Sequence, residues 1–335
     1  MYNFSKIVFS ILILFLFQDI NSAELPLTEQ ATISPLASKS LLLQSDRYNS
    51  LAVVVGERGH ILYSVNDKDW IQALVETRLT LTNVFMLDEK TGWAVGHDAV
   101  ILKTSDGAKT WQKIFSNIND EAPLLDLFFK DESNGIAIGA YSLVYVTSDG
   151  GLSWQKKELN LSANDEDEFS SEATDVFDLH LNAIAYAGDK RFYIAAEAGH
   201  IFRSDDNGKS WTDLPSTYRG SFFGVLPLSF NKVLAYGLRG HLYYSSDAGK
   251  SWEQIETKSK EMLTEAAVLT NGNIVVVGLS GTLLLSKDNA RSFSTIDLHH
   301  RHGLSAVLET EDGSILLTGD AGVELLSQDS MVIQH

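Results

Sequence analysis

Short apolar runs, each bounded by Gly, Asn or Asp, recur along the chain. One unit contains such runs at residues 265–269, 274–278 and 282–285, and in a neighbouring unit a fourth run opens at Trp252. Strand-length apolar runs between turn-forming residues predict β-strands. Four runs in each unit therefore predict a four-stranded antiparallel sheet.

A polar motif follows the third run of each unit. Residues 204–211 read Ser-Asp-Asp-Asn-Gly-Lys-Ser-Trp, with relatives at 104–111, 147–154, 245–252 and 286–293 and incomplete copies from Ser64 and from Ser327. The third position of the motif is occupied in turn by Asn66, Asp106, Asp149, Asp206, Asp247, Asp288 and Asp329. These positions are 40, 43, 57, 41, 41 and 41 residues apart. Sheets that recur at such a period bury their faces by stacking radially, so the sequence predicts an all-β, seven-bladed β-propeller of four-stranded antiparallel blades.

The motif residues are expected to have a structural role. An Asp side chain in a turn accepts backbone N–H bonds, and the Gly of the motif can adopt a positive φ. Side chains on the periphery of seven different blades could not converge on one substrate, so no catalytic residue is assigned among them.

The N-terminus has the layout of a signal peptide. Lys6 precedes an apolar run over residues 7–17, and small residues at 21–23 offer a cleavage site. The run is shorter than the roughly 20 residues that span a bilayer as a helix. We expect residues 1–23 to be removed and residues 24–335 to form one exported propeller, in the periplasm or a compartment equivalent to the thylakoid lumen. A retained membrane anchor is the alternative.

Closure of the ring is a separate question, because few residues follow Asp329. We hypothesise that the segment around residues 27–35 supplies or extends the outer strand of the seventh blade.

Charge and composition exclude several classes of protein. The chain has 335 residues, with 26 Lys and Arg against 44 Asp and Glu, and a net charge of −18. This acidity argues against nucleic-acid binding, which requires a basic surface. The absence of cysteine excludes disulfides, thiolate metal sites and a catalytic thiol. We expect no cofactor and no metal.

The motif is the Asp box, also called the bacterial neuraminidase repeat. The segment 91–107, from Thr-Gly-Trp-Ala-Val-Gly-His to Thr-Ser-Asp-Gly, and the segment 136–154 resemble the photosystem II stability and assembly factor family of exported seven-bladed propellers. The resemblance implies a chaperone-like protein that holds newly made membrane subunits during assembly. Similar domains also occur in bacteria without photosynthesis, and nothing in the sequence identifies a photosynthetic host.

Candidate binding residues emerge from the phase of the repeat. Twenty-eight positions before the third residue of each motif, at the expected mouth of the central channel, stand Ser38, Arg78, Glu121, Asp178, Arg219, Lys260 and Arg301. Arg78, Arg219, Lys260 and Arg301 form a basic arc, which we expect to bind an acidic peptide terminus or loop, because Arg pairs bidentately with carboxylates. Alternatively, each cation neutralises a neighbouring carboxylate.

Two further segments carry possible chemistry. An acidic insertion at about 160–178, with Asn-Asp-Glu-Asp-Glu at 164–168, is interpreted as a recognition loop, a weak Ca²⁺ site or simply a solvated loop. His299, His300 and His302 could bind a transition metal, although adjacent histidines are more often ordinary surface residues.

The sequence thus predicts a monomeric, non-catalytic assembly factor or interaction platform for membrane or envelope proteins, or a stable subunit of an envelope complex. The alternative is a sialidase-like glycoside hydrolase, since Asp boxes also occur in such enzymes. In that case Glu121, Asp178 or Glu197 would be the acid and Tyr141 would lie nearby, with Arg78, Arg219 and Arg301 binding the substrate carboxylate.

Overall fold

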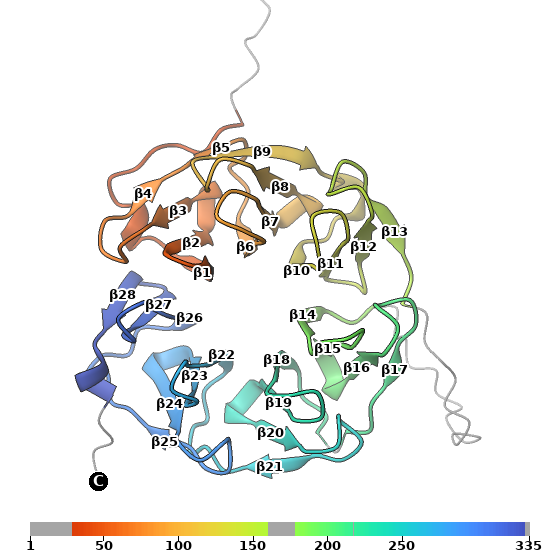
Figure 1. The fold of residues 1–335 in the computed structure, drawn as a ribbon, viewed down its shortest axis with the longest axis vertical. Helices are drawn as coiled ribbons and strands as arrows, with labels where there is room; N and C mark the ends of the chain where they lie inside the picture. Colours follow the sequence, from red (N-terminus) through yellow and green to blue (C-terminus); the bar gives the residue numbers. More distant parts are fainter. Residues whose placement is uncertain (1–28, 160–177, 217, 332–335) are drawn as a thin grey trace, which may run out of the picture.

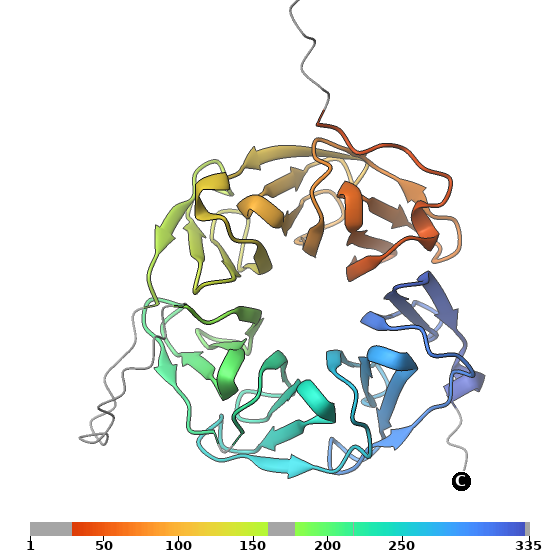
Figure 2. The same cartoon turned by 180° about the vertical axis from the view of Figure 1, so that it is seen from behind.

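Seven β-sheets stand around a central axis like the blades of a propeller (Figures 1 and 2). The computed structural model describes residues 29–159, 178–216 and 218–331. The predicted signal peptide and all but the last residue of the acidic insertion lie outside these residues. Among the described residues, no helix is long and apolar enough to cross a bilayer.

The strands of each blade follow one another from the axis outward. Blade 1 consists of β1 (Leu42–Tyr48), β2 (Leu51–Gly56), β3 (Ile61–Ser64) and β4 (Ile71–Gln72). Blade 2 consists of β6 (Leu81–Met86), β7 (Gly92–Gly96), β8 (Ile101–Thr104) and β9 (Thr110–Phe115), with β5 (Leu74–Val75) added parallel to β9. Blade 3 consists of β10 (Leu124–Phe129), β11 (Gly135–Gly139), β12 (Val144–Thr147) and β13 (Gln155–Lys157). Blade 4 consists of β14 (Leu181–Tyr186), β15 (Phe192–Ala196), β16 (Ile201–Ser204) and β17 (Thr212–Asp213).

The remaining blades continue the pattern. Blade 5 consists of β18 (Phe222–Pro227), β19 (Val233–Gly237), β20 (Leu242–Ser245) and β21 (Glu253–Ile255). Blade 6 consists of β22 (Leu263–Val268), β23 (Ile274–Gly278), β24 (Thr282–Ser286) and β25 (Ser294–Thr295). Blade 7 consists of β26 (Leu304–Glu309), β27 (Ile315–Gly319) and β28 (Gly322–Leu326). Short 3-10 turns complete the described chain: η1 (Ala37–Lys39), η2 (Glu57–Gly59), η3 (His97–Ala99), η4 (Ile118–Asp120), η6 (Glu197–Gly199), η7 (Leu238–Gly240), η8 (Leu279–Gly281) and η9 (Gln328–Met331).

Burial explains why the apolar runs differ in length and pattern. The second strand of a blade is covered on both faces, and every residue of β23 is buried. The outermost strand is covered less, so that all three residues of β13 are exposed. A strand with two covered faces needs a continuous apolar run, whereas an edge strand tolerates polar residues. The apolar clusters lie between neighbouring blades; one contains Ile138 of blade 3 and Phe192 of blade 4.

Side chains on the innermost strands also link one blade to the next. The second residue of the strand donates a hydrogen bond to the carbonyl that begins the next innermost strand. These bonds are Thr82 Oγ1 to Leu124 O (2.7 Å), Asn182 Nδ2 to Phe222 O (2.7 Å), Thr264 Oγ1 to Leu304 O (2.9 Å) and Ser305 Oγ to Leu42 O (2.6 Å). The last of them joins blade 7 to blade 1 and so closes the ring.

The hypothesis of an N-terminal latch on blade 7 is wrong for the described part of that segment. Residues 29–35 lie along blades 1 and 2, where Ala31 N donates to Val75 O and Gln72 Nε2 donates to Thr32 O. Blade 7 has three strands within the described residues. Closure instead rests on Ser305 and on an apolar cluster that joins Leu316 of blade 7 to blade 1.

The Asp-box residues have the predicted structural role. Asp206 accepts hydrogen bonds from Ser204 Oγ (2.8 Å), from the backbone N–H of Ser210 (3.0 Å) and from Ser210 Oγ (2.7 Å). The same pattern recurs at Asp106, Asp149, Asp247 and Asp288. At Asn66 the amide oxygen accepts instead, from the N–H of Asp69 at 2.9 Å. These bonds stabilise the charged carboxylate, and the hydroxyl of Ser251 in particular lowers the pKa of Asp247 to about 2.

The seventh copy of the motif is different. Asp329 lies in η9, directly after the last described strand, and makes none of these contacts within the described residues. Position 333, where its partner in the motif would stand, lies outside them.

The pair Asp206 and Asp329 tests the structural role of the motif. The substitution Asp206→Ala removes one acceptor from several donors in a tight turn, and it should lower the free energy of unfolding by about 1–3 kcal/mol. The substitution Asp329→Ala should change it by less than about 0.5 kcal/mol. Urea unfolding followed by circular dichroism measures both. Equal destabilisation by the two substitutions would contradict this assignment.

Candidate functional site

One face of the ring is built from two sets of loops, and we call it the mouth face. The first set is the lead-in loops, which precede the innermost strands, and the second is the turns between the second and third strands. In every blade, a backbone N–H of the turn donates to the carbonyl at the end of the lead-in loop. The pairs, with the donor first, are Glu57 with Leu41, His97 with Thr80, Ala140 with Pro123, Glu197 with His180, Leu238 with Ser221, Leu279 with Met262, and Asp320 with Gly303.

Each turn on the mouth face also touches the lead-in loop of the next blade. Gly240 of blade 5 adopts a φ of +72°, and a Cβ there would lie 2.1 Å from Ser259 O of blade 6. Gly322 of blade 7 (φ +85°) is equally close to Ser38 O of blade 1. Only glycine combines this φ with so close an approach. The mouth face is therefore a continuous ring of loops that includes the junction between the first and last blades.

The four predicted cations all lie on the mouth face. Arg78, Arg219, Lys260 and Arg301 each stand three residues before an innermost strand, at the start of blades 2, 5, 6 and 7, and all four are exposed. Arg78 Nε donates to Gln30 O at 2.9 Å. Among the described residues, none of the four cations forms an ion pair with a carboxylate. The alternative in which each cation neutralises a neighbour therefore has no support in the described part of the chain.

Sequence reasoning missed two arginines on the same face. Arg58 and Arg239 occupy the turns of blades 1 and 5, are exposed, and adopt a φ of 57°. Each is followed by Gly-His in the sequence, so this repeated Arg-Gly-His is the signal that could have identified them. Arg239 adds a cation between Arg219 and Lys260 in ring order.

The two acidic residues at the same repeat position as the predicted cations lie on the opposite arc. Glu121 and Asp178 are exposed in the lead-in loops of blades 3 and 4. The ring of Tyr141 packs edge-on against His180 at 5.3 Å, and Glu197 accepts the backbone N–H of His180 at 3.0 Å. The proposed acids of the hydrolase alternative thus share one face with the arginines.

A second group of carboxyls, which sequence reasoning also missed, lies on the innermost strands. Asp126 Oδ2 accepts the N–H of Ile184 in the next blade at 2.7 Å, and Glu265 Oε2 accepts the N–H of Val307 at 2.9 Å. Asp46 Oδ2 accepts the N–H of Met86 of blade 2 in a similar way. Asp126 and Glu265 occupy the same position of their strands, two residues after the first, which was a recognisable signal.

Burial raises the pKa of these three carboxyls, to about 6 for Asp46, about 7 for Asp126 and about 8 for Glu265. The charges of Asp46 and Asp126 contribute to the raised pKa of Glu265, so groups from blades 1, 3 and 6 act on one another across the axis. Since Asp126 and Glu265 bind backbone N–H groups of neighbouring blades, their role is to hold blades together.

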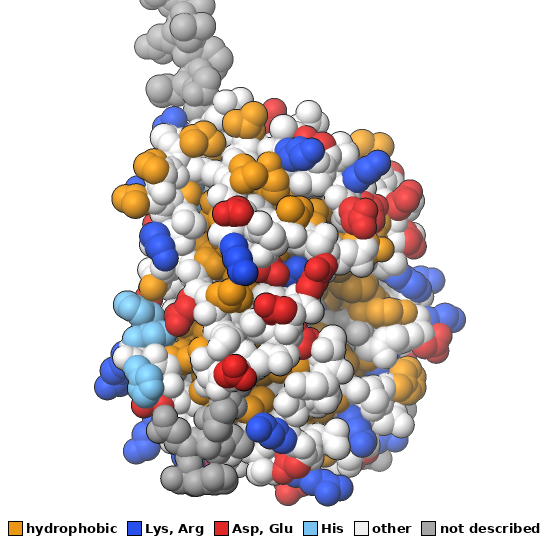
Figure 3. All heavy atoms as spheres, turned by 60° about the vertical axis from the view of Figure 1, so that its left-hand side comes forward, with side chains coloured by type: hydrophobic (Ala, Val, Ile, Leu, Met, Phe, Trp, Pro, Cys, Tyr) orange, Lys and Arg blue, Asp and Glu red, His pale blue; other side chains and the backbone are white. Residues whose placement is uncertain are grey.

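The histidines near blade 7 are paired with acids. His299 Nδ1 lies 3.3 Å from Asp297, His300 Nε2 lies 3.0 Å from Glu324, and His302 Nδ1 lies 3.4 Å from Asp320. Histidine side chains gather at one edge in Figure 3, while acidic and basic side chains intermingle over the rest of that view. The described residues contain no group of three or more His, Asp or Glu that could hold a metal ion.

Comparisons with known proteins bear on both fold and family. A family model described as photosynthesis system II assembly factor YCF48 matches residues 113–258, which confirms the predicted resemblance over that part of the chain. No curated protein matches the sequence.

Similar solved structures extend the likeness in fold to nearly the whole ring. They include YCF48 bound to a D1 peptide, with a TM-score of 0.66 and 15% identity over 86% of this chain and 93% of that chain. YCF48 from Cyanidioschyzon merolae has a TM-score of 0.70 and 15% identity over 90% of this chain and 99% of that chain. A GH74 xyloglucanase from Xanthomonas campestris has a TM-score of 0.65 and 14% identity over 85% of this chain and 52% of that chain. At these identities, the likeness is one of fold.

The raised pKa of Asp126 predicts a pH dependence of stability. Folding binds a proton between the ordinary pKa of 3.8 and the folded value of about 7, so the contribution of this group to stability is present at low pH and is lost as pH rises through that range. From about pH 5 to about pH 8, the free energy of unfolding of the native chain should fall by about 1–3 kcal/mol more than that of Asp126→Asn.

Urea unfolding of both proteins at several pH values measures this difference. Titrating groups that do not interact with Asp126 are common to the two proteins and cancel. The pKa of Glu265, which the charge of Asp126 helps to raise, is raised less in the variant, and this adds to the difference in the same direction. Curves that run parallel across the pH range would contradict the raised pKa.

Proposed function

We propose that this chain is an exported assembly factor or interaction platform that binds an acidic segment of a membrane or envelope protein at its mouth face. The basic arc of Arg78, Arg219, Lys260 and Arg301, extended by Arg58 and Arg239, is the binding site. Residues 1–23 direct export, and the mature monomer works in the periplasm or an equivalent compartment without catalysing a reaction.

The observation that carries the proposal is a set of exposed cations on one face, most of which have no carboxylate partner among the described residues. The exception is Arg58, whose Nε lies 3.9 Å from Glu57 Oε2. The cations without such a partner are Arg78, Arg219, Arg239, Lys260 and Arg301. In a chain with a net charge of −18, most cations would be expected to pair with acids. A guanidinium group without a carboxylate partner keeps N–H donors for a ligand carboxylate, which a planar Arg side chain can bind through two parallel hydrogen bonds. At Arg78 the Nε donor is used by Gln30 O, and the terminal NH2 groups remain for such a ligand. The acidic arc of blades 3 and 4 would repel the same ligand and so orient it across the ring.

The family match supports the same proposal. The matched model describes an assembly factor, and one similar solved structure contains YCF48 bound to a D1 peptide. By analogy, we propose a peptide segment of a membrane protein as the partner here.

The glycoside hydrolase alternative draws support only from the fold, through the similar xyloglucanase. A hydrolase needs one carboxyl with a raised pKa close to a second carboxyl that is ionised. In this chain the raised pKa values belong to Asp46, Asp126 and Glu265, which bind backbone N–H groups. This arrangement favours a binding role over hydrolysis.

Removal of the arginine arc tests the binding proposal. The triple variant Arg78→Ala, Arg219→Ala and Arg301→Ala should lose at least about tenfold in recovery of crosslinked partner from the native envelope. Its melting temperature should stay within about 2 °C of the native value, because the three side chains are exposed. Crosslinking of the tagged full chain, followed by mass spectrometry, measures the recovery.

A matched control removes three cations from the other face. Lys109, Lys250 and Arg291 all stand three residues after an Asp-box aspartate and are exposed. Their replacement by Ala should leave partner recovery unchanged. Equal recovery by both triple variants would refute the arc as the binding site.

An activity assay separates the two candidate functions. Purified full chain incubated with sialosides, xyloglucan and aryl glycosides should release no sugar above the rate of a buffer control. Turnover that disappears in Glu121→Gln or Asp178→Asn would instead establish the hydrolase.

A further inference from the structure

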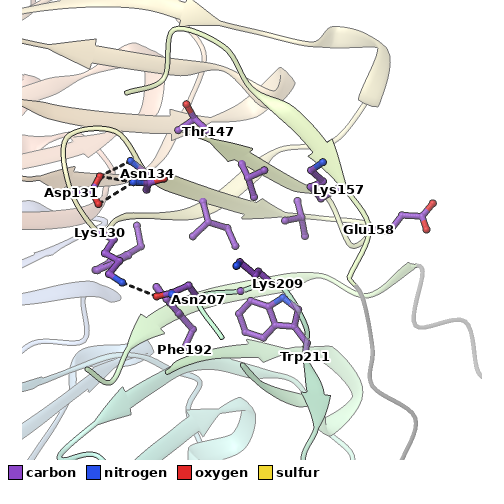
Figure 4. Close-up of a pocket in the computed structure, with 16 residues that line it drawn as sticks. Lys130, Asp131, Asn134, Thr147, Lys157, Glu158, Phe192, Asn207, Lys209 and Trp211 are labelled. Carbon is purple, nitrogen blue, oxygen red and sulfur yellow. Dashed lines mark hydrogen bonds between the residues drawn. The ribbon is translucent and has the colours of Figure 1, made fainter. Parts of the chain in front are cut away.

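An elongated cleft lies between blades 3 and 4 (Figure 4) and has a volume of about 630 Å³. Its walls come from β10 to β13 and the turn after β10 on one side, and from β15 and the Asp-box turn of blade 4 on the other. Both turns belong to the face opposite the mouth face. The turn between the first and second strands of a blade and its Asp-box turn, between the third and fourth strands, lie together on that face, as the hydrogen bond from Asn207 N to Lys190 O shows for blade 4. The cleft is therefore separate from the basic arc.

A local change in the repeat explains why a cleft opens here. In blade 2, the paired residues Trp93 and Lys103 point toward blade 3, where both donate to Gly150 O at 3.2 and 2.9 Å. Trp93 also stacks on Phe129 at 3.5 Å, so this junction is filled.

The junction between blades 4 and 5 is bridged in the same way. Tyr193 and Arg203 are paired across the strands of blade 4, and Arg203 Nη1 donates to Ala248 O at 2.7 Å. In blade 3 the equivalent pair is Ile136 and Val146. These side chains offer no hydrogen-bond donor to the next Asp-box turn, although Ile136 Cδ1 lies 3.7 Å from where a Cβ on Gly208 would stand. The space that remains beside them is the cleft.

The cleft combines an apolar floor with cations along its length. Phe192, Trp211 and Ile136 lie on the floor, and Lys130, Lys157 and Lys209 line the rim. Figure 4 shows Lys130 at one end and Lys157 toward the other, with Trp211 and Lys209 between them. A single-headed amphiphile would need the cations at one end, whereas this distribution suits a chain with a negative charge on both sides of an apolar group.

Asp131 and Glu158 are the acidic residues that line the cleft within the described part of the chain. Hydrogen bonds from Asn134 and Ser133, with a smaller effect of the charge of Lys130, lower the pKa of Asp131, so this carboxylate offsets Lys130 in part. Asp131 is engaged locally, since it accepts the N–H groups of Ser133 and Asn134 at 2.9 and 2.8 Å. The carboxylate of Glu158 is directed away from the cleft (Figure 4). Among the described residues, Lys130 and Lys157 form no ion pair, and Lys130 Nζ donates to the neutral Asn207 Oδ1 at 2.8 Å.

We infer that this cleft is a second docking site, whose occupant is a peptide segment of a partner protein with a large apolar side chain flanked by acidic residues. The apolar side chain would contact Trp211 and Phe192, and the flanking carboxylates would bind Lys130 and Lys157. A volume of about 630 Å³ lies within the range of roughly 300–1,000 Å³ that is usual for ligand pockets.

A labelled synthetic peptide tests this site on the full chain. The peptide Gly-Asp-Glu-Phe-Leu-Asp-Glu-Gly should bind in fluorescence anisotropy, and it should bind about tenfold more weakly when Phe-Leu is replaced by Ser-Ser or when the four acids are replaced by their amides. The double substitution Lys130→Gln and Lys157→Gln should weaken the intact peptide to a similar extent. Lys109→Gln with Lys250→Gln makes the same change in charge on other blades and should have no effect.

A filling substitution tests the location independently of charge. Ile136→Trp places in blade 3 the residue that fills the junction after blade 2, and it should abolish binding while the melting temperature is retained. A benzophenone group on the peptide should crosslink to residues of blades 3 and 4 that line the cleft.

Three results would overturn the inference. They are no binding at millimolar peptide, binding that survives Ile136→Trp, and binding that is lost in the triple arginine variant of the mouth face, which would place the peptide on the basic arc. Because the arc and the cleft are altered by different substitutions, failure of one proposal leaves the other intact.

Discussion

The structure depends on one constraint: the second strand of a blade is apolar on both faces, so no blade can be covered unless a neighbour stands on each side. Six of the seven junctions can be satisfied by stacking successive blades along the chain, but the last junction requires the ends of the chain to meet. In the described residues no strand is shared between the first and last blades. Closure rests on apolar packing around Leu42 and Leu316 and on the hydrogen bond from Ser305 to Leu42.

Polar groups at the junctions follow from the same constraint. Backbone N–H and carbonyl groups along the innermost strands lose water when the blades pack together, and side chains from the preceding blade satisfy them. Thr82, Asn182, Thr264 and Ser305 supply donors, while Asp126 and Glu265 supply acceptors. Ionisable acceptors in such positions make the junctions sensitive to pH, because a buried carboxyl keeps its proton to a higher pH than an exposed one.

Departures from the repeat coincide with the two candidate sites. Where the repeat is regular, a position is occupied by the same kind of residue in successive blades and has a structural role, as in the Asp boxes. Cations replace neutral or acidic residues in the lead-in loops of four blades, and they produce a basic arc on one face of an acidic ring. Smaller side chains at Ile136 and Val146 leave a cleft on the other face. Function in this fold is therefore to be sought where the pattern changes.

The sequence by itself determined the number of blades, the strands within them and the role of the Asp box, because these depend on local patterns that recur at a fixed period. It also placed Arg78, Arg219, Lys260 and Arg301 on one face, because residues at the same position of successive repeats lie on the same face of the ring. Only the tertiary structure decided what holds the ring closed, which carboxyls act on one another across the axis, and where neighbouring blades fail to fill the space between them. These features depend on contacts between residues far apart in the sequence. The backbone N–H of Ile184 lies 58 residues from Asp126, and the carbonyl of Leu42 lies 263 residues from Ser305. A periodic pattern does not say how far one side chain reaches toward the next blade.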